Sequence, residues 1–362
     1  MSLSQARLSP PRPAGPQAAP LLVRAALRQR VERTPVWFMR QAGRALPEYR
    51  EVRQRHGLIE ICQEPELCAR VTLQPVERLG VDGAVLFADI MLPIAFGLGV
   101  ALELVEGVGP VIEQPLRRRE DVERLRATPA EEAVPFVMET IRILRRSLPT
   151  GVAVIGFSGA PFTLAGYLIE GRPSRDFLRT KAVMLGEPAL WDALMSRLSR
   201  MVLDYLLAQA RAGAQLLQLF DSWVGALAPD DYRERVLPYV GPIFEGLAAA
   251  GIPSVHFGTG TAGLLPLLRE AGGDVIGLDW RVELGAAWRE IGYDRGVQGN
   301  LDPAALLAPW PELERRAARV LAGAAGRPGH IFNLGHGVLP ETPVDQLQRL
   351  TELVRTGTGT GG

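Results

Sequence analysis

The chain reads Val152-Ala153-Val154-Ile155-Gly156-Phe157-Ser158-Gly159-Ala160-Pro161, an apolar run of strand length that passes directly into a turn of small and polar residues. A short apolar run bounded by turn residues is typical of a strand that is buried on both faces. Eight such runs alternate with longer amphipathic stretches, at 36–39, 83–87, 152–157, 215–220, 254–257, 275–278, 296–298 and 330–334. This alternation predicts βα units around a parallel sheet.

Eight strand-helix repeats without a composition break favour a closed (β/α)8 TIM barrel over a doubly wound open sheet. We therefore expect one α/β domain over residues 21–355. Residues 100–105 alternate in polarity and reach 111–113 through Gly107 and Gly109, which predicts a β-hairpin inserted after the second strand. Residues 187–213 predict a long helix that is apolar on one face and ends at Gly213.

Composition excludes several classes of function. The 40 Lys and Arg residues balance 40 Asp and Glu residues, so no global field attracts nucleic acid or an acidic membrane. The longest apolar run, 90–102, is too short to span a bilayer. Cys62 and Cys68 suit neither a disulfide scaffold nor a zinc knuckle, and we expect two reduced thiols in a cytoplasmic protein. Residues 1–20 lack the apolar core of a signal peptide, and with residues 356–362 they are predicted to be flexible tails.

Arginines cluster directly after the first predicted strand. The segment reads Met39-Arg40-Gln41-Ala42-Gly43-Arg44, and Arg53 follows nearby. Arginine holds a carboxylate with a rigid planar fork, and glycine lets the backbone approach a ligand closely. The segment is therefore a candidate carboxylate-binding loop. The alternative is a surface loop with solvated arginines, since most arginine is exposed.

Polar or glycine-rich turns follow every predicted strand, at the end where a barrel of this kind gathers its catalytic groups. Ordinary turn chemistry explains part of this pattern. The turns contain Arg40, Asp89, 158–161, Asp221 with Ser222, 258–260, Asp279, 299–300 and 335–337.

Two of these turn residues, and Tyr167 downstream of the third strand, have both a structural and a functional interpretation. Asp89 follows an apolar strand and either caps the next helix or acts as a desolvated carboxylate that stabilises positive charge. Tyr167 is either a packed ring with a tethered hydroxyl or a substrate contact. His336 lies between two glycines that leave its ring uncovered, and is either a local hydrogen-bonding residue or a catalytic one. His56, His256 and His330 receive the structural interpretation.

Eight motifs in order make the chain resemble the uroporphyrinogen decarboxylase family, in its bacterial form. They read PVWFMRQAGRALPEYR, FADI, GFSGAPFTLAGYLIEG, LFDSWVGAL, HFGTG, GLDW, QGNLDP and FNLGHGVLPETP, and they extend from about Leu21 to about Val354.

The resemblance implies a (β/α)8 barrel that removes carbon dioxide from the four acetate arms of uroporphyrinogen III, giving coproporphyrinogen III in haem biosynthesis. It implies no metal and no organic cofactor. It assigns Asp89 to the pyrrole N–H groups and Arg40 and Arg44 to substrate carboxylates, with Gln41, Ala42 and Gly43 completing the binding loop. Arg53 is a weaker candidate, and Tyr167, Ser222 and His336 match residues that contact substrate. The catalytic candidates are Asp89, Arg40, Tyr167 and His336.

The same resemblance implies a cytoplasmic homodimer that binds neither nucleic acid nor membranes. One departure is Ala45, which stands where relatives usually carry an aromatic residue. A zinc-dependent methyltransferase on the same barrel is a rival, but it needs a His-x-Cys pair, whereas His256 is followed by Phe257 and Gly258. A binding protein without catalysis is the second rival, and the retained polar residues weigh against it.

Overall fold

Seven parallel strands form the central sheet of the computed structural model, which describes residues 19–105 and 108–357. They follow one another around the sheet in chain order, and every neighbouring pair is parallel. The strands are β1 (Gly83–Val85), β4 (Ala153–Gly159), β5 (Leu216–Asp221), β6 (Ser254–Gly258), β7 (Val275–Gly277), β8 (Gly296–Leu301) and β9 (His330–Leu334). Seven of the eight predicted strands are therefore confirmed, with small shifts at their ends.

The remaining predicted strand, at 36–39, is reduced to a single parallel bridge between Val36 and Phe332. On this side, the Phe332 N–H donates to the Pro35 carbonyl at 2.9 Å, and the Trp37 N–H donates to the Phe332 carbonyl at 3.3 Å. On the other side, the Asp82 N–H donates to the Val36 carbonyl at 2.8 Å. The Val36 N–H donates to the Asp82 carboxylate at 2.8 Å, so the backbone ladder ends there. The segment still lies between β9 and β1, and it closes the predicted barrel.

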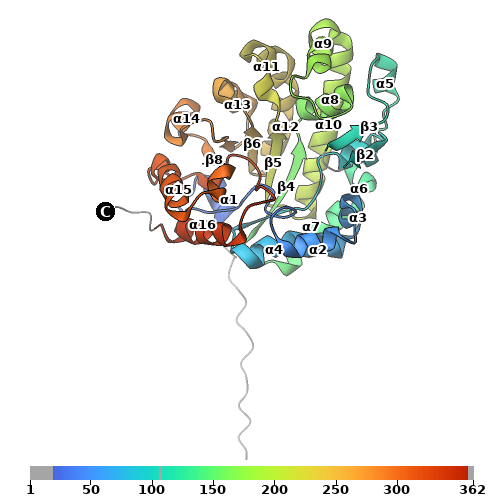
Figure 1. Cartoon of the computed structure of the whole chain (residues 1–362). Coiled ribbons are helices and arrows are strands. Elements are labelled where there is room, and N and C mark those ends of the chain that lie inside the picture. The colour runs from blue at the N-terminus through green and yellow to red at the C-terminus, as the bar shows by residue number, and fades with distance from the viewer. Residues whose placement is uncertain (1–18, 106–107, 358–362) are drawn as a thin grey trace, which may run out of the picture.

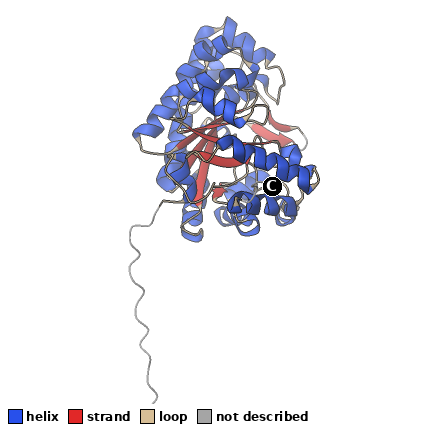
Figure 2. Ribbon diagram, turned by 90° about the vertical axis from the view of Figure 1, so that its left-hand side faces the viewer, coloured by secondary structure: helices blue, strands red, loops and turns tan. Residues whose placement is uncertain are grey.

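Helices surround the strands, as Figures 1 and 2 show from two directions. The longest, α10, confirms the helix predicted at 187–213, and Gly213 after it has a φ of +122° that favours glycine. The α-helices are α1 (Leu21–Ala26), α2 (Pro47–Arg53), α3 (Leu58–Gln63), α4 (Pro65–Leu79), α5 (Arg119–Glu123), α6 (Ala130–Ala133), α7 (Pro135–Ser147), α8 (Pro161–Glu170), α9 (Leu178–Gly186), α10 (Pro188–Ala212), α11 (Pro229–Arg235), α12 (Leu237–Ala249), α13 (Leu265–Ala271), α14 (Leu284–Ile291), α15 (Trp310–Ala324) and α16 (Val344–Thr356). Shorter turns of 3-10 or π geometry are η1 (Pro93–Gly97), η2 (Val224–Ala226), η3 (Ala262–Leu264) and η4 (Pro303–Leu307).

The predicted hairpin is also confirmed. It consists of β2 (Leu102–Val105) and β3 (Gly109–Ile112), which pair in antiparallel fashion. The Ile112 N–H donates to the Gly171 carbonyl at 2.8 Å, and the Leu116 N–H donates to the Leu168 carbonyl at 2.8 Å. These bonds attach the insertion to α8 and the residue that ends it, beside which the hairpin lies in Figure 1.

A chain of polar side chains crosses the barrel interior beneath the arginine loop. The Trp37 indole N–H donates to Gln298 Oε1 at 3.1 Å, and the Gln298 amide donates to Gln218 Oε1 at 3.0 Å. The Gln218 amide lies 3.6 Å from the Met39 sulfur, and both glutamines are at most 1% exposed. Buried polar groups need partners of this kind. The network therefore holds Met39, the residue directly before Arg40, in place.

Most of the two predicted tails, at 1–20 and 356–362, lies outside the described residues. The first helix, α1, begins at Leu21, and the last, α16, ends at Thr356. Cys62 and Cys68 are free and buried, and both thiols point at the Phe87 carbonyl. Over the described ranges, every helix is too short or too polar to cross a membrane.

Candidate active site

Gln41 shapes the loop that carries the two predicted carboxylate-binding arginines. Its side chain is 1% exposed, accepts the Phe38 N–H at 2.9 Å and donates to the Gly83 carbonyl at 2.8 Å. Gly43 completes the turn with a φ of +85°, and a Cβ there would lie 2.6 Å from the Phe87 ring. Gln41 and Gly43 therefore fix the loop, and the Gln41 amide is occupied by backbone groups.

The backbone of Arg40 is in the left-handed conformation, with a φ of +58° that non-glycine residues seldom adopt. The Val338 N–H donates to the Met39 carbonyl at 2.9 Å, which ties the loop to the segment that follows β9. A Cβ on Gly337 would lie only 2.5 Å from Arg40 Cδ. The glycine after His336 therefore leaves room for the Arg40 side chain.

Arg40 and Arg44 form a pair of guanidinium groups with no hydrogen bond or ion pair to another side chain in the described part of the chain. Desolvation lowers the pKa of Arg40, and the neighbouring Arg44 cation lowers it further, while Asp89 and Tyr167 act in the opposite direction. Two neighbouring guanidinium groups without a hydrogen-bonded acid partner bind anions well.

Asp89 faces Arg40 from the turn after β1. Its Oδ1 accepts the Met91 N–H at 2.8 Å, which fixes the turn before η1, and Oδ2 makes no hydrogen bond within the described residues. The predicted helix cap is wrong, because the N-cap of η1 is Leu92 and no side chain caps it. Burial raises the pKa of Asp89, an effect that the Met91 N–H and the Arg40 cation partly oppose. One carboxylate oxygen is therefore held by the turn, and the other can contact a ligand.

Tyr167 lies beside this carboxyl group, on α8. Burial raises the pKa of its hydroxyl to about 12, and the Asp89 charge contributes to the rise. Its ring centroid is 4.4 Å from that of Trp223, which follows Ser222 at the end of β5. Tyr167 and Ser222 are both partly exposed, and the Ser222 carbonyl accepts the Thr259 hydroxyl. Because its pKa is raised to about 12, the Tyr167 hydroxyl stays protonated near neutral pH.

His336 completes the cluster from the turn after β9. Burial lowers its pKa to about 4, and the Arg40, Arg44 and Arg281 cations contribute to the decrease. Near neutral pH the ring is therefore a neutral imidazole, which has one N–H donor and one acceptor. His330, in contrast, is buried and lies 3.0 Å from the Gly299 carbonyl, which confirms its structural interpretation.

Arg281 is the residue that the sequence reasoning missed, although it directly follows the quoted GLDW motif. It lies near His336 and forms an ion pair with Asp279 at 2.8 Å. The structure does not bring Arg53 into the cluster. Arg53 is exposed at the end of α2 and donates to the His56 carbonyl at 2.6 Å, so its substrate contact stays a prediction.

His256, the residue that a zinc-binding relative would use, is fully buried in β6. Its ring nitrogens lie 3.4 Å from Asp221 Oδ2 and 3.3 Å from the Leu268 carbonyl. Across residues 19–105 and 108–357, no three His, Cys, Asp or Glu side chains are arranged to hold a metal ion. His256 is therefore a core residue, as predicted.

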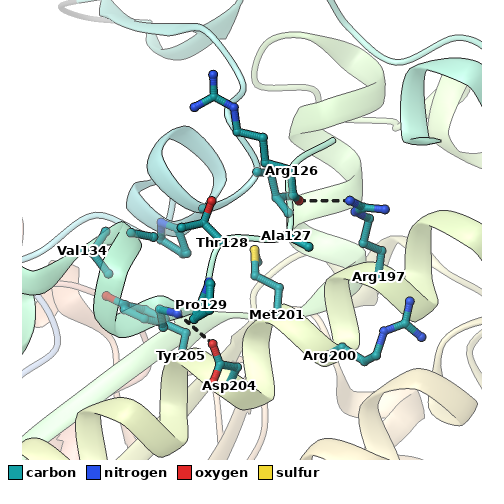
Figure 3. Close-up of a pocket in the computed structure, with 15 residues that line it drawn as sticks. Arg126, Ala127, Thr128, Pro129, Val134, Arg197, Arg200, Met201, Asp204 and Tyr205 are labelled. Carbon is teal, nitrogen blue, oxygen red and sulfur yellow. Dashed lines mark hydrogen bonds between the residues drawn. The ribbon is translucent and has the colours of Figure 1, made fainter. Parts of the chain in front are cut away.

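A hollow of about 350 Å³ lies elsewhere on the molecule, between α10 and the segment around α6 (Figure 3). Arg197 donates to the Leu125 and Arg126 carbonyls there, and Asp204 accepts the Ala130 N–H at 2.8 Å. None of the predicted site residues lines it. The hollow is therefore separate from the cluster at the strand ends.

The cluster combines unpaired guanidinium groups, a desolvated carboxyl group, a protonated phenol and a neutral imidazole. Guanidinium groups bind carboxylates, and a desolvated carboxylate stabilises a cation that develops beside it. Such a site suits a ligand with several carboxylates and a core that becomes positively charged.

Comparisons with known proteins agree with this chemistry. The chain is 56% identical over 335 residues to a protein of Thermus thermophilus named uroporphyrinogen decarboxylase, covering 92% of this chain and 97% of that protein. A protein of Sorangium cellulosum with the same name is 53% identical over 334 residues, covering 92% and 95%. Among solved structures, a methyltransferase from Methanosarcina mazei is similar with a TM-score of 0.77 and 19% identity, covering 93% and 98%, which shows a shared fold. The profile of the family described as "Uroporphyrinogen decarboxylase (URO-D)" matches residues 17–357, so the chain belongs to the uroporphyrinogen decarboxylase family.

Proposed function

We propose that this protein is a carboxy-lyase that converts uroporphyrinogen III into coproporphyrinogen III in porphyrin biosynthesis. One observation carries the proposal. Arg40 and Arg44, neither of which has a hydrogen-bonded acid partner, lie beside the Asp89 carboxyl group, whose pKa is raised by burial. The names of the relatives at more than 50% identity support the same activity.

Each decarboxylation replaces one carboxylate with one proton. A proton first adds to the pyrrole α-carbon next to the carbon that bears the acetate, which gives a cationic ring. The bond between the acetate methylene and its carboxylate then breaks, carbon dioxide leaves, and the electron pair enters the ring and neutralises it. A second proton adds to the exocyclic carbon to form the methyl group, and the ring proton is released.

Asp89 is suited to stabilise the cationic ring. In the proposed complex its carboxylate accepts hydrogen bonds from the pyrrole N–H groups, while Met91 continues to hold Oδ1. A preorganised charge in a desolvated site contributes more than the same charge in water. This role requires the ionised carboxylate, which the Arg40 cation favours.

Arg40 and Arg44 bind substrate carboxylates, and Tyr167, Ser222 and His336 contact the ring or its arms. Arginine stays protonated under physiological conditions, so we propose Arg40 as the ion-pair partner of the reacting acetate and not as its general acid. The reaction then uses side chains of this chain alone. From the resemblance to the uroporphyrinogen decarboxylase family, we also propose that the protein is a cytoplasmic homodimer.

The test is anaerobic incubation of the purified protein with uroporphyrinogen III, with and without a metal chelator. The products are oxidised and separated by carboxylate number. Stepwise loss of four carboxyl groups in both samples supports the proposal. No loss in either sample would leave a binding protein, and loss that the chelator abolishes would indicate metal-dependent chemistry.

A further inference from the structure

Arg281 stands at the strand-end edge of the barrel, after β7, where Arg40 and His336 also lie. Its side chain is 52% exposed, whereas that of its ion-pair partner Asp279 is 2% exposed. The acid is thus part of the protein interior, and the guanidinium group extends from it toward solvent.

Two side-chain contacts and one backbone hydrogen bond hold Arg281 in one place. Nη1 donates to Asp279 Oδ2 at 2.8 Å, and the Arg281 backbone N–H donates to Oδ1 at 2.8 Å. The guanidinium carbon lies 4.0 Å from the ring centroid of Trp280. The Gly260 N–H also donates to the Asp279 carboxylate, and the Asn300 amide donates to the Asp279 carbonyl at 2.8 Å. This anchoring restricts the side chain and lowers the entropy that it loses on binding a ligand.

Trp280 links Arg281 to the cluster. Its ring meets that of His336 edge to face, with centroids 6.4 Å apart and planes at 88°. The Nε and Nη2 groups of Arg281 have no hydrogen-bond partner in the described residues. The half-exposed Arg281 guanidinium group therefore has N–H donors without partners, near His336.

We propose that Arg281 binds a carboxylate arm of the substrate, on a different side of the ring from Arg40 and Arg44. The inference rests on the proposed function, because it requires a ligand with carboxylates around its rim. Arg40 and Arg44 come from one loop after the first barrel segment, while Arg281 comes from the turn after β7. A polycarboxylate held from one side only would leave its other arms without counter-ions.

The competing explanation is that Arg281 merely neutralises the buried Asp279. The two roles make different predictions for the Arg281→Ala variant. Loss of a substrate contact away from the reacting acetate raises KM and leaves kcat unchanged, since such binding is equal in the ground and transition states. Loss of a purely structural ion pair lowers the melting temperature without a selective effect on KM.

The experiment combines kinetics with equilibrium binding. KM and kcat for uroporphyrinogen III are measured anaerobically, and the Kd for oxidised uroporphyrin is measured by fluorescence, for the wild type, Arg281→Ala, Arg281→Gln and Arg281→Lys. Arg289→Ala is the matched control, because it removes the same charge at the opposite end of α14, in the same βα unit.

We expect Arg281→Ala and Arg281→Gln to raise both KM and Kd about fivefold, as a half-exposed charge pair allows. Arg281→Lys should recover part of the loss, since it keeps the charge without the planar fork. Arg289→Ala should match the wild type. The Gln variant retains a hydrogen-bond donor near Asp279, so it remains informative if the Ala variant folds poorly.

Unchanged KM and Kd in a folded Arg281→Gln variant would overturn the inference and leave Arg281 as a structural ion-pair partner. Failure of the proposed function gives a different result, because the wild type itself would then bind uroporphyrin without decarboxylating uroporphyrinogen III. In that case a weaker Kd for the variants would still support Arg281 as a carboxylate-binding residue, and an unchanged Kd would refute it.

Discussion

Replacement of Asp89 by Asn separates the turn hydrogen bond of this residue from its charge. The amide oxygen can still accept the Met91 N–H, which the Asp89 carboxylate accepts at 2.8 Å, so the turn is preserved. The negative charge facing the substrate ring is lost. A charge pair at about 4 Å is worth about 4 kcal/mol at an effective dielectric constant of about 20. The Asp89→Asn variant should therefore decarboxylate uroporphyrinogen III about 10³-fold more slowly.

Although Asp89→Asn should lower the decarboxylation rate, it should leave the stability of the fold unchanged or raise it. Burial raises the pKa of Asp89, so the folded protein binds this proton more tightly than the unfolded chain does. The free energy of unfolding therefore falls as pH rises through the raised pKa, and at neutral pH the ionised carboxylate destabilises the fold. The Asp89→Asn variant should melt at the same or a higher temperature near pH 7, and this difference should disappear in acid.

The assay is single-turnover decarboxylation under anaerobic conditions, with products separated by carboxylate number and thermal melts on the same samples. The wild-type rate should fall as pH drops through the raised pKa of Asp89, and the Asn variant should lack that acid limb. Asp89→Ala serves as the comparison, since it also removes the hydrogen bond from the Met91 N–H and should cost about 1 kcal/mol of stability. A folded Asp89→Asn variant within tenfold of the wild-type rate would refute the charge argument.

Four further predictions test neighbouring parts of the site. Arg40→Ala should reduce kcat/KM by the equivalent of about 2–5 kcal/mol, because bound substrate would cover this exposed side chain and desolvate the charge pair, and unchanged steady-state kinetics would make Arg40 a solvated surface residue. Gly337→Ala should lower kcat/KM about 10²-fold with little change in melting temperature, because the new Cβ would displace Arg40 from a distance of 2.5 Å. Gln41→Ala should lower the free energy of unfolding in urea by about 2–4 kcal/mol, since two buried backbone groups lose their partner; a loss below 1 kcal/mol would contradict this. His336 should titrate near pH 4 by NMR, and its contribution to stability should be lost as pH falls from about 6.5 toward that value; a midpoint above 6 would contradict the burial and charge effects.

Much of the barrel was predictable because buried strands leave a local signal. The apolar runs at 152–157 and 330–334 match β4 and β9 closely, and the alternation at 100–105 matches the hairpin. The run at 36–39 was misleading in one respect. It has the composition of a strand, but the Asp82 side chain captures the Val36 N–H, so only a bridge forms.

The candidate site was predictable only as a set of strand ends. Arg40, Asp89, Tyr167 and His336 were each singled out from motifs, yet a motif does not show that Gln41 is buried in the loop or that Arg53 donates to the His56 carbonyl. Arg281 gave no separate signal, because an arginine after a turn is usually solvated. Its anchoring by Asp279 and Trp280 appears only in the folded structure.

By itself, the sequence determined the order of strands and helices, the edge at which the polar turns gather and the residue types available there. Periodicity and turn composition are local properties, and they report burial along the chain. Only the tertiary structure decided which charges face one another, because Arg40, Asp89, Arg281 and His336 come from separate βα units that meet when the barrel closes. The electrostatic interactions among these residues are consequences of that closure, and no single segment contains them.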